Sequence, residues 1–373
     1  MRVSPRLREV ALPCHQPVTA REEEEFMAVV IGLVTDSNAW KRAVVVLQQL
    51  RDVETKLPAV VFNTTALANY AVAAMRALEA TVVSLEPEMP LHKPMLTPLS
   101  RSHGKAPAWR KLALWAQLTY SKIIYLDIDV LVMKNIDHMA SFPADAFTPE
   151  VCAWPKCEAE RIPAGINVGV MIVGPDQWKF DALKAYALLT SSRLEEAKDA
   201  EKLKGLGTRY LGSAEQSFIR EFYEDVMNAS LGDPVAARRG WDWGVQSYTD
   251  VGACRRIERR DPTRAHGCVP GTTHVMSRRY NARPLDCARC PASIDNIIVH
   301  YACSIKPWER KRSHWRTMAW CHGSRNRTND VLCEPCIGIL TEGWFSAEDR
   351  MCATLRTAAE SSPDVAQAFK SRC

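Results

Sequence analysis

The chain has 373 residues, of which 47% are apolar and 24% charged, a composition that is typical of globular proteins and excludes a largely disordered chain. Its 48 basic and 43 acidic side chains leave a net charge of +5, which fits a phosphate-bearing ligand and is too small to indicate a nucleic-acid partner. The length allows one large α/β domain with an appendage, or two domains.

The beginning of the chain has no pattern of a membrane anchor. Residues 1–25 hold no apolar run of signal-peptide length and end in a run of glutamates. The apolar stretch at 26–34 is too short to span a bilayer, because a transmembrane helix needs about 20 residues. We therefore expect no transmembrane segment in this chain.

Apolar runs of strand length alternate with stretches of helical character from residue 27 onwards. Strands are expected at 27–34, 58–62, 81–85, 123–126, 151–154, 166–173 and 296–301. Helices are expected at 39–50, 66–80, 107–120, 176–189 and 213–226, with a charged and solvated helix at 191–205 and a loop-rich stretch at 229–271. This alternation predicts an α/β fold with a doubly wound, mostly parallel sheet. Ligands of such a sheet bind at the carboxyl ends of its strands.

The strand at 123–126 ends in Asp127-Ile128-Asp129. Since side chains alternate along a strand, both carboxylates leave on the same side, where the strand stops. Two carboxylates so close together repel unless a cation lies between them, and oxygen ligands suit Mg²⁺ or Mn²⁺. An isolated Asp-x-Asp is more often a plain surface loop, so the flanking sequence decides between the two interpretations.

Cysteines are concentrated in the last third of the chain. Ten of the 13 lie within 254–373, and the Cys-x-x-Cys pairs at 287–290 and 333–336 have a spacing typical of zinc sites. The same density suits disulfides in a secretory lumen, and scattered reduced thiols are a third alternative. Three Asn-x-Ser/Thr sequences favour the lumen: Asn63, Asn228 and Asn326. We expect disulfides rather than zinc, and a Golgi or other secretory lumen rather than the cytoplasm.

The flanks of the Asp pair carry a resemblance to a known family. Segment 111–137 reads KLALWAQLTYSKIIYLDIDVLVMKNID. Its order of Lys-Leu, Trp, Tyr-Ser-Lys, a strand, Asp-x-Asp and Asn-Ile-Asp resembles the nucleotide-sugar glycosyltransferases of the glycogenin and galactinol synthase kind, glycosyltransferase family eight. A match of this length is far more specific than Asp-x-Asp alone.

This resemblance extends in order from residue 29 to residue 308, with a long variable stretch in the middle. It implies a sheet of the GT-A type and a division of the chain into three parts. These are an N-terminal extension at 1–25, a catalytic domain at 26–308 and a Cys- and Trp-rich extension at 309–373.

Two further segments imply residues near the sugar. GINVGVMIVGP at 165–175 resembles the family's Phe-Asn-(Ser/Ala)-Gly-Val strand, which implies that Asn167 is a ligand of the donor sugar. GSAEQSFIREF at 212–222 is similar to the family's Asp-Gln or Glu-Gln helix start. This match implies that Glu215 and Gln216 lie near the reacting carbon.

The segment HYACSIKPW at 300–308 is similar to the family's His-(Phe/Tyr)…Lys-Pro-Trp motif. The match implies that His300 is the third protein ligand of the metal and that Lys306 meets the donor diphosphate. By the same resemblance, Thr35 and Asp36 begin the loop that binds uridine, and Lys111 reaches the donor. Three positions depart from the family pattern and put the shape of the sugar pocket, or the path of the backbone, in question: Ile166, Val168 and Cys303.

The resemblance implies a metal-dependent, retaining glycosyltransferase that moves a hexose from a UDP-sugar to a hydroxyl of a carbohydrate or protein acceptor. The cation would be Mn²⁺, with Mg²⁺ as an alternative, held by Asp127, Asp129 and His300. No nucleic-acid partner is expected, and a homodimer is left open. One alternative is a phosphohydrolase of the haloacid dehalogenase type. Such proteins have Thr or Val two residues after the second Asp, where this chain has Leu131. The other is a non-catalytic sugar-nucleotide-binding protein of the same fold.

Overall fold

The computed structural model describes twelve stretches of the chain: residues 27–34, 38–63, 66–85, 106–149, 166–196, 214–225, 245–249, 272–276, 280–282, 296–301, 307–309 and 334–373. The strand expected at 151–154, the Cys-x-x-Cys pair at 287–290 and Cys333 of the second pair therefore lie outside the described residues, whereas Cys336 falls within a described helix.

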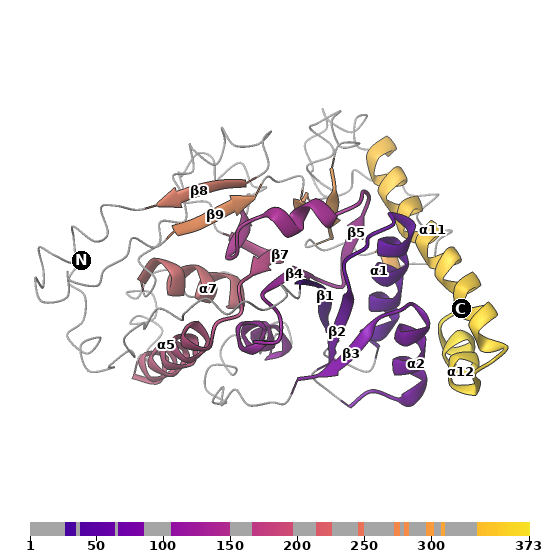
Figure 1. Ribbon diagram of the computed structural model, residues 1–373, viewed down its shortest axis with the longest axis horizontal. Helices are drawn as coiled ribbons and strands as arrows, with labels where there is room; N and C mark the ends of the chain where they lie inside the picture. Colours follow the sequence, from indigo (N-terminus) through magenta and orange to yellow (C-terminus); the bar gives the residue numbers. More distant parts are fainter. Residues whose placement is uncertain are drawn as a thin grey trace, which may run out of the picture.

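One large sheet organises the described structure (Figure 1). Its strands follow the order β3-β2-β1-β4-β7-β6-β9-β8. In chain order they are β1 (Met27–Val34), β2 (Ala59–Asn63), β3 (Thr81–Ser84), β4 (Lys122–Leu126), β6 (Ala146–Pro149), β7 (Ile166–Val173), β8 (Val245–Thr249) and β9 (Thr272–Met276). The four strands from β3 to β4 are parallel, whereas β7 runs antiparallel to both β4 and β6. A second sheet of two antiparallel strands consists of β5 (Val130–Val132) and β10 (Ile298–His300).

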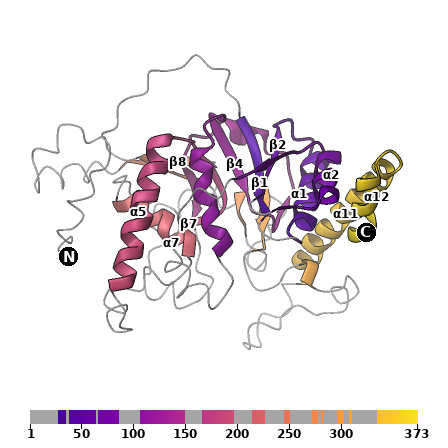
Figure 2. The ribbon, with the colours of Figure 1, turned by 90° about the horizontal axis from the view of Figure 1, so that it is seen from below.

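Helices cover both faces of the large sheet (Figures 1 and 2). On one face lie α1 (Trp40–Asp52), α2 (Asn69–Ala77), α11 (Glu334–Ala359) and α12 (Pro363–Arg372). On the other lie the 3-10 helix η2 (Ala106–Ala116), α5 (Gln177–Glu196) and α7 (Ala214–Asp225). Two short 3-10 segments complete the described elements: η3 (Asp137–Ser141) and η9 (Pro307–Glu309). The doubly wound α/β class predicted from the sequence is confirmed.

Strand β4 contributes to both cores because its side chains alternate. Ile124 and Leu126 pack in the core beneath α1 and α11, whereas Ile123 and Tyr125 pack in the core beneath η2, α5 and α7. Parallel pairing with β1 leaves the carboxyl ends of both strands at the same edge of the sheet. Asp127 follows β4 directly, so the acidic pair lies at the edge where doubly wound sheets bind ligands.

Several element predictions need correction. The helix expected at 107–120 is the 3-10 helix η2, whose period of three residues turns both Leu112 and Trp115 into the core. The Trp115 indole donates a hydrogen bond of 3.2 Å to the Tyr223 hydroxyl on α7, and burial raises the pKa of Tyr223 well above its usual value. Within the loop-rich stretch 229–271, the described residues form β8, whose Val, Tyr and Thr favour a strand.

The C-terminal part of the chain contains two helices that the sequence analysis did not predict. Along α11, buried Trp344, Met351 and Leu355 recur at spacings of seven and four residues and form one apolar stripe facing α1 and α2. The Trp344 ring lies 5.9 Å from Tyr301 and 4.8 Å from Trp308, between ring centroids. The domain boundary at 308/309 stays a prediction. Among the described residues, no helix is both long and apolar enough to cross a membrane.

A disulfide joins Cys352 on α11 to Cys373 after α12. It agrees with the expectation of disulfides in this region, for this one pair. Its partners are separated by 21 residues, so the bond closes the turn between the two helices.

Cys373→Ser is expected to lower the free energy of unfolding by up to about 3 kcal/mol, the loop-entropy value for a closed loop of this size. Chemical unfolding of the oxidised proteins measures the loss. Cys352→Ser and the double variant serve as controls, because all three changes break the same bond and should cost the same. A wild type no more stable than either single variant would show that the two thiols are not joined.

Candidate active site

The acidic pair occupies the connection between the two sheets. Asp127 follows the last residue of β4, and Asp129 precedes the first residue of β5. The Asp127 amide donates a hydrogen bond of 2.7 Å to the Gly169 carbonyl on β7, which fixes the backbone where β4 ends. The side chains of Asp127 and Asp129 are 21% and 22% exposed, so both carboxylates are accessible yet held on a folded surface.

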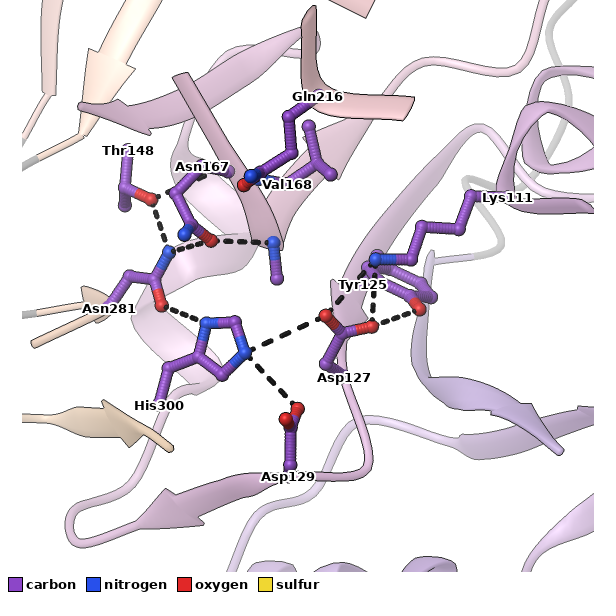
Figure 3. Close-up of polar contacts among 11 residues, drawn as sticks. Lys111, Tyr125, Asp127, Asp129, Thr148, Asn167, Val168, Gln216, Asn281 and His300 are labelled. Carbon is purple, nitrogen blue, oxygen red and sulfur yellow. Dashed lines mark hydrogen bonds and ion pairs between the residues drawn. The ribbon is translucent and has the colours of Figure 1, made fainter. Parts of the chain in front are cut away.

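Strand β10 brings His300 to these carboxylates. It pairs antiparallel with β5, so that His300 lies opposite Val130, and the Tyr301 amide donates a 2.8 Å hydrogen bond to the Asp129 carbonyl. The His300 Nε2 atom lies 3.1 Å from Asp129 Oδ1 and 3.7 Å from Asp127 Oδ2 (Figure 3). The sequence-predicted metal ligands are thus brought together.

These three side chains fit a divalent cation. Each offers one ligand atom, and the atoms of Asp127, Asp129 and His300 all lie within 4.8 Å of one another. Carboxylate oxygens suit Mg²⁺ and Mn²⁺, whereas an imidazole nitrogen is a ligand for softer ions of the transition series. A mixed set of two carboxylates and one imidazole therefore suits a divalent cation.

Lys111 contacts the acidic pair directly. It projects from η2 and is 6% exposed, and its Nζ lies 3.0 Å from Asp127 Oδ1 and 3.1 Å from Oδ2. The Tyr125 hydroxyl donates a hydrogen bond of 2.6 Å to Asp127 Oδ1. The Lys111 ammonium and the Tyr125 hydroxyl therefore both orient the Asp127 carboxylate, and the ammonium balances part of its charge (Figure 3).

A buried hydrogen-bond network contacts His300 on the side away from the carboxylates. Two of its members, Asn281 and Thr148, were not predicted from the sequence. Asn281 accepts a hydrogen bond from His300 Nδ1 at 3.0 Å, and its amide nitrogen donates to Asn167 Oδ1 at 2.7 Å and Thr148 Oγ1 at 2.6 Å. The Gly169 amide donates to the same Asn167 oxygen at 2.8 Å. Asn167 Oδ1 is thus occupied by protein donors, which leaves the Nδ2 group as the part of this side chain that could meet a sugar.

The remaining predicted residues are distributed as follows. Gln216 lies in the first turn of α7, and its Oε1 accepts a hydrogen bond of 3.1 Å from the Val168 amide, next to Asn167. Glu215 belongs to the same turn, but its side chain is outside what the structure describes. Three predicted residues lie outside the described residues altogether: Thr35, Asp36 and Lys306.

Replacement of Gly169 is predicted to disturb the site through His300. A methyl group at this position would overlap Cε1 and Nδ1 of the imidazole. We expect Gly169→Ala to weaken Mn²⁺ binding by about tenfold or more, since overpacking a filled site costs about 1–3 kcal/mol. Calorimetry or electron paramagnetic resonance of added Mn²⁺ measures the change.

Gly343→Ala is the matched control for this change. Gly343 lies on α11, and a methyl group there would approach the flexible Leu131 side chain at 3.3 Å. This variant should bind Mn²⁺ like the wild type. Equal Mn²⁺ affinity of a folded Gly169→Ala protein would contradict the placement of His300 in a metal site.

No protein-family model matches the chain. Among curated proteins, inositol phosphorylceramide glucuronosyltransferase 1 of Arabidopsis thaliana is 31% identical over 126 residues, which are 34% of this chain and 18% of that protein. Galactinol synthase 1 of Solanum lycopersicum is 33% identical over 82 residues, 18% of this chain and 26% of that protein. The chain therefore spans only a minor part of the length of these curated relatives.

Among solved structures, the galactosyltransferase LgtC in complex with donor and acceptor sugar analogues is similar with a TM-score of 0.46 and 13% identity, covering 85% of this chain and 95% of that one. Galactinol synthases recur among the sequence relatives, and they are the kind of protein that the motifs at 111–137 resemble. The chain thus resembles the glycosyltransferases of family eight, and it has the doubly wound α/β sheet expected of their GT-A type.

Proposed function

We propose that the protein is a Mn²⁺-dependent, retaining glycosyltransferase that moves a hexose from a UDP-sugar to an acceptor hydroxyl. One observation carries the proposal: Asp127, Asp129 and His300 converge at the carboxyl edge of the large sheet, with their ligand atoms within 4.8 Å of one another. That edge is where doubly wound sheets bind their ligands. The likeness to a glucuronosyltransferase and to galactinol synthases supports the same class of reaction.

The chemistry requires charge stabilisation on the leaving group. A nucleoside diphosphate leaves the sugar with growing negative charge on its oxygens, and cationic groups aimed at that charge lower the barrier. When bound, a divalent cation supplies Lewis-acid stabilisation of these oxygens. In our proposal, Asp127, Asp129 and His300 hold the cation, and Lys111 and Lys306 contact the diphosphate as point charges.

The residues on β7 and α7 serve the sugar in this proposal. Asn167 directs its Nδ2 group to a hydroxyl of the donor sugar, because its Oδ1 is already occupied by Gly169 and Asn281. Gln216, which is anchored to the backbone of β7 through Oε1, and Glu215, which precedes it in the chain, lie near the reacting carbon in this proposal. Thr35 and Asp36 bind the uridine.

A screen of nucleotide sugars with Mn²⁺ tests the proposal and its two alternatives. Release of free nucleotide together with a glycosylated product supports transfer. Turnover of p-nitrophenyl phosphate without sugar transfer would instead indicate a phosphohydrolase. Tight binding of a UDP-sugar with neither reaction would indicate a non-catalytic binding protein.

Asp129→Asn is predicted to reduce metal-dependent transfer by on the order of 10²-fold or more while the fold is kept, since loss of one charge-stabilising group typically costs that much. Asp181→Asn is the matched control, because Asp181 lies on α5 in an exposed pair with Lys184 at 2.6 Å. Initial rates at saturating Mn²⁺ measure both. Wild-type turnover by folded Asp129→Asn would remove the acidic pair from the active site.

Lys111→Met is predicted to shift two affinities in opposite directions. Without nucleotide, the variant should bind Mn²⁺ at least about tenfold more tightly than the wild type, because it lacks the ammonium beside Asp127 that repels the metal cation. The affinity for UDP should fall, because a contact of the diphosphate is lost. Calorimetry measures both, with Lys184→Met as the control, because this half-buried lysine on α5 pairs with Asp181, away from the acidic pair. If both affinities fall together, Lys111 only supports the position of Asp127 and does not contact the diphosphate.

The proposed compartment is a secretory lumen, with the Golgi preferred. The Cys352–Cys373 disulfide supports it, because disulfides persist in oxidising compartments. Asn63 does not add support, since it ends β2 and is only 9% exposed, whereas glycosylation needs an accessible asparagine. Protection of the protein from added protease in sealed microsomes tests the compartment, and digestion without detergent would contradict it.

A further inference from the structure

The hydrogen bonds behind His300 determine which atom of each amide is which. The Gly169 backbone N–H can only donate a hydrogen bond. Its partner at 2.8 Å on Asn167 must therefore be the oxygen, Oδ1. The opposite orientation of the Asn167 amide would place two donors against each other.

The orientation of the Asn281 amide follows in the same way. The atom of Asn281 that lies 2.7 Å from Asn167 Oδ1 must be a donor, and so it is Nδ2. This nitrogen also donates to Thr148 Oγ1 at 2.6 Å. The other atom of the amide, Oδ1, consequently lies 3.0 Å from His300 Nδ1 and can only accept. His300 Nδ1 therefore carries a hydrogen.

A neutral imidazole has one protonated and one unprotonated nitrogen. With the hydrogen on Nδ1, the lone pair of His300 is on Nε2, which lies 3.1 Å from Asp129 Oδ1 and 3.7 Å from Asp127 Oδ2. A lone pair directed at two carboxylates is unfavourable by itself and becomes favourable with a cation among the three groups. The network thus presents to the acidic pair the form of the imidazole that ligates metals.

We propose that Asn281 is a positioning residue, which fixes the Nδ1–H form of His300 through the chain Gly169–Asn167–Asn281 and so holds Nε2 ready as a metal ligand. The inference rests on the metal site proposed above and adds the residue that prepares it. The network is well suited to this task because its members are almost fully enclosed: Thr148 is 1%, Asn167 5%, His300 5% and Asn281 8% exposed. Water therefore competes little for these hydrogen bonds.

The first test needs neither metal nor activity. Nitrogen-15 spectra of the metal-free wild type, labelled at its nine histidines and recorded at alkaline pH on the neutral ring, report which nitrogen of His300 is protonated. The His300 signals are assigned by their loss in His300→Gln. We expect hydrogen on Nδ1 and none on Nε2. A hydrogen on Nε2 would overturn the proposal whatever the variants do.

The second test compares two substitutions of similar size. Asn281→Leu removes the acceptor of the Nδ1 hydrogen, whereas Asn281→Asp keeps an oxygen there, and both remove the donor to Asn167 and Thr148. We expect Asn281→Leu to mix the two forms of the His300 ring and to weaken Mn²⁺ binding by about 10- to 100-fold, the usual effect of losing such a partner. Asn281→Asp should keep the Nδ1–H form and bind Mn²⁺ more tightly than the Leu variant.

Thr354→Val is the control, since Thr354 lies on α11 outside this network and donates its hydrogen bond of 3.1 Å to the Gln48 side chain. It should change the Mn²⁺ affinity by less than about threefold. If Asn281→Leu does not fold, Asn281→Ala removes the same acceptor and carries the same expectation. A folded Leu or Ala variant with the wild-type ring form and wild-type Mn²⁺ affinity would overturn the role of Asn281.

The two tests separate this inference from the proposed function. A wild type that carries hydrogen on Nδ1 but does not bind Mn²⁺ would refute the metal site and, with it, the purpose assigned to Asn281. A wild type that binds Mn²⁺ through a ring protonated on Nε2 would refute the positioning role alone. Loss of affinity in Asn281→Leu with an unchanged ring form would show a structural effect and would also count against the inference.

Discussion

The antiparallel pairing of β5 with β10 is the interaction on which the candidate site depends. Asp127 and Asp129 would form an acidic turn at a sheet edge without it, because the imidazole comes from a segment far along the chain. The pairing is short, with three residues in each strand, and it is extended by the hydrogen bond from Tyr301 to Asp129. A separate bridge holds β10 to Ala282, whose carbonyl accepts a hydrogen bond from the His300 amide. These contacts make a site of three ligands from two distant parts of the sequence.

Both cores support that arrangement from opposite sides. Beneath η2, α5 and α7, the packing includes Tyr125, together with Leu112 next to Lys111 and Phe218 close to Gln216 in the sequence. Beneath α1 and α11, the packing includes Leu131 and Val299, so the small sheet is part of the same apolar core as the C-terminal helices. The polar groups therefore lie on rigid elements, which is the condition for holding them in a fixed geometry before a ligand arrives.

Local sequence was enough to predict the parts of the structure with a strong period or a dense motif. The strand at 166–173 agrees with β7 residue for residue, and the Asp-x-Asp turn lies where a strand end was expected. Asn281 could not be found in this way, because it precedes the isolated bridge residue Ala282 in a segment whose sequence carries no strand or helix pattern. Its part in the site comes from contacts with Asn167 and His300, which lie elsewhere in the sequence. Residues that act through a partner leave little local pattern of their own.

The aromatic contacts of Trp344 link α11 to Tyr301 and Trp308, next to the candidate site. Trp344 packs against both Tyr301 and Trp308, and the Tyr301 hydroxyl donates a hydrogen bond of 2.9 Å to the Leu340 carbonyl. Both described flanks of Lys306 are therefore anchored on α11. A splice variant or a truncation that lacks α11 would lose the contacts of Tyr301 and Trp308 with Trp344 and would expose the apolar side of the small sheet. The C-terminal helices thus support the small sheet, so that engineered shortening from this end would disturb the candidate site without removing any of its candidate ligands.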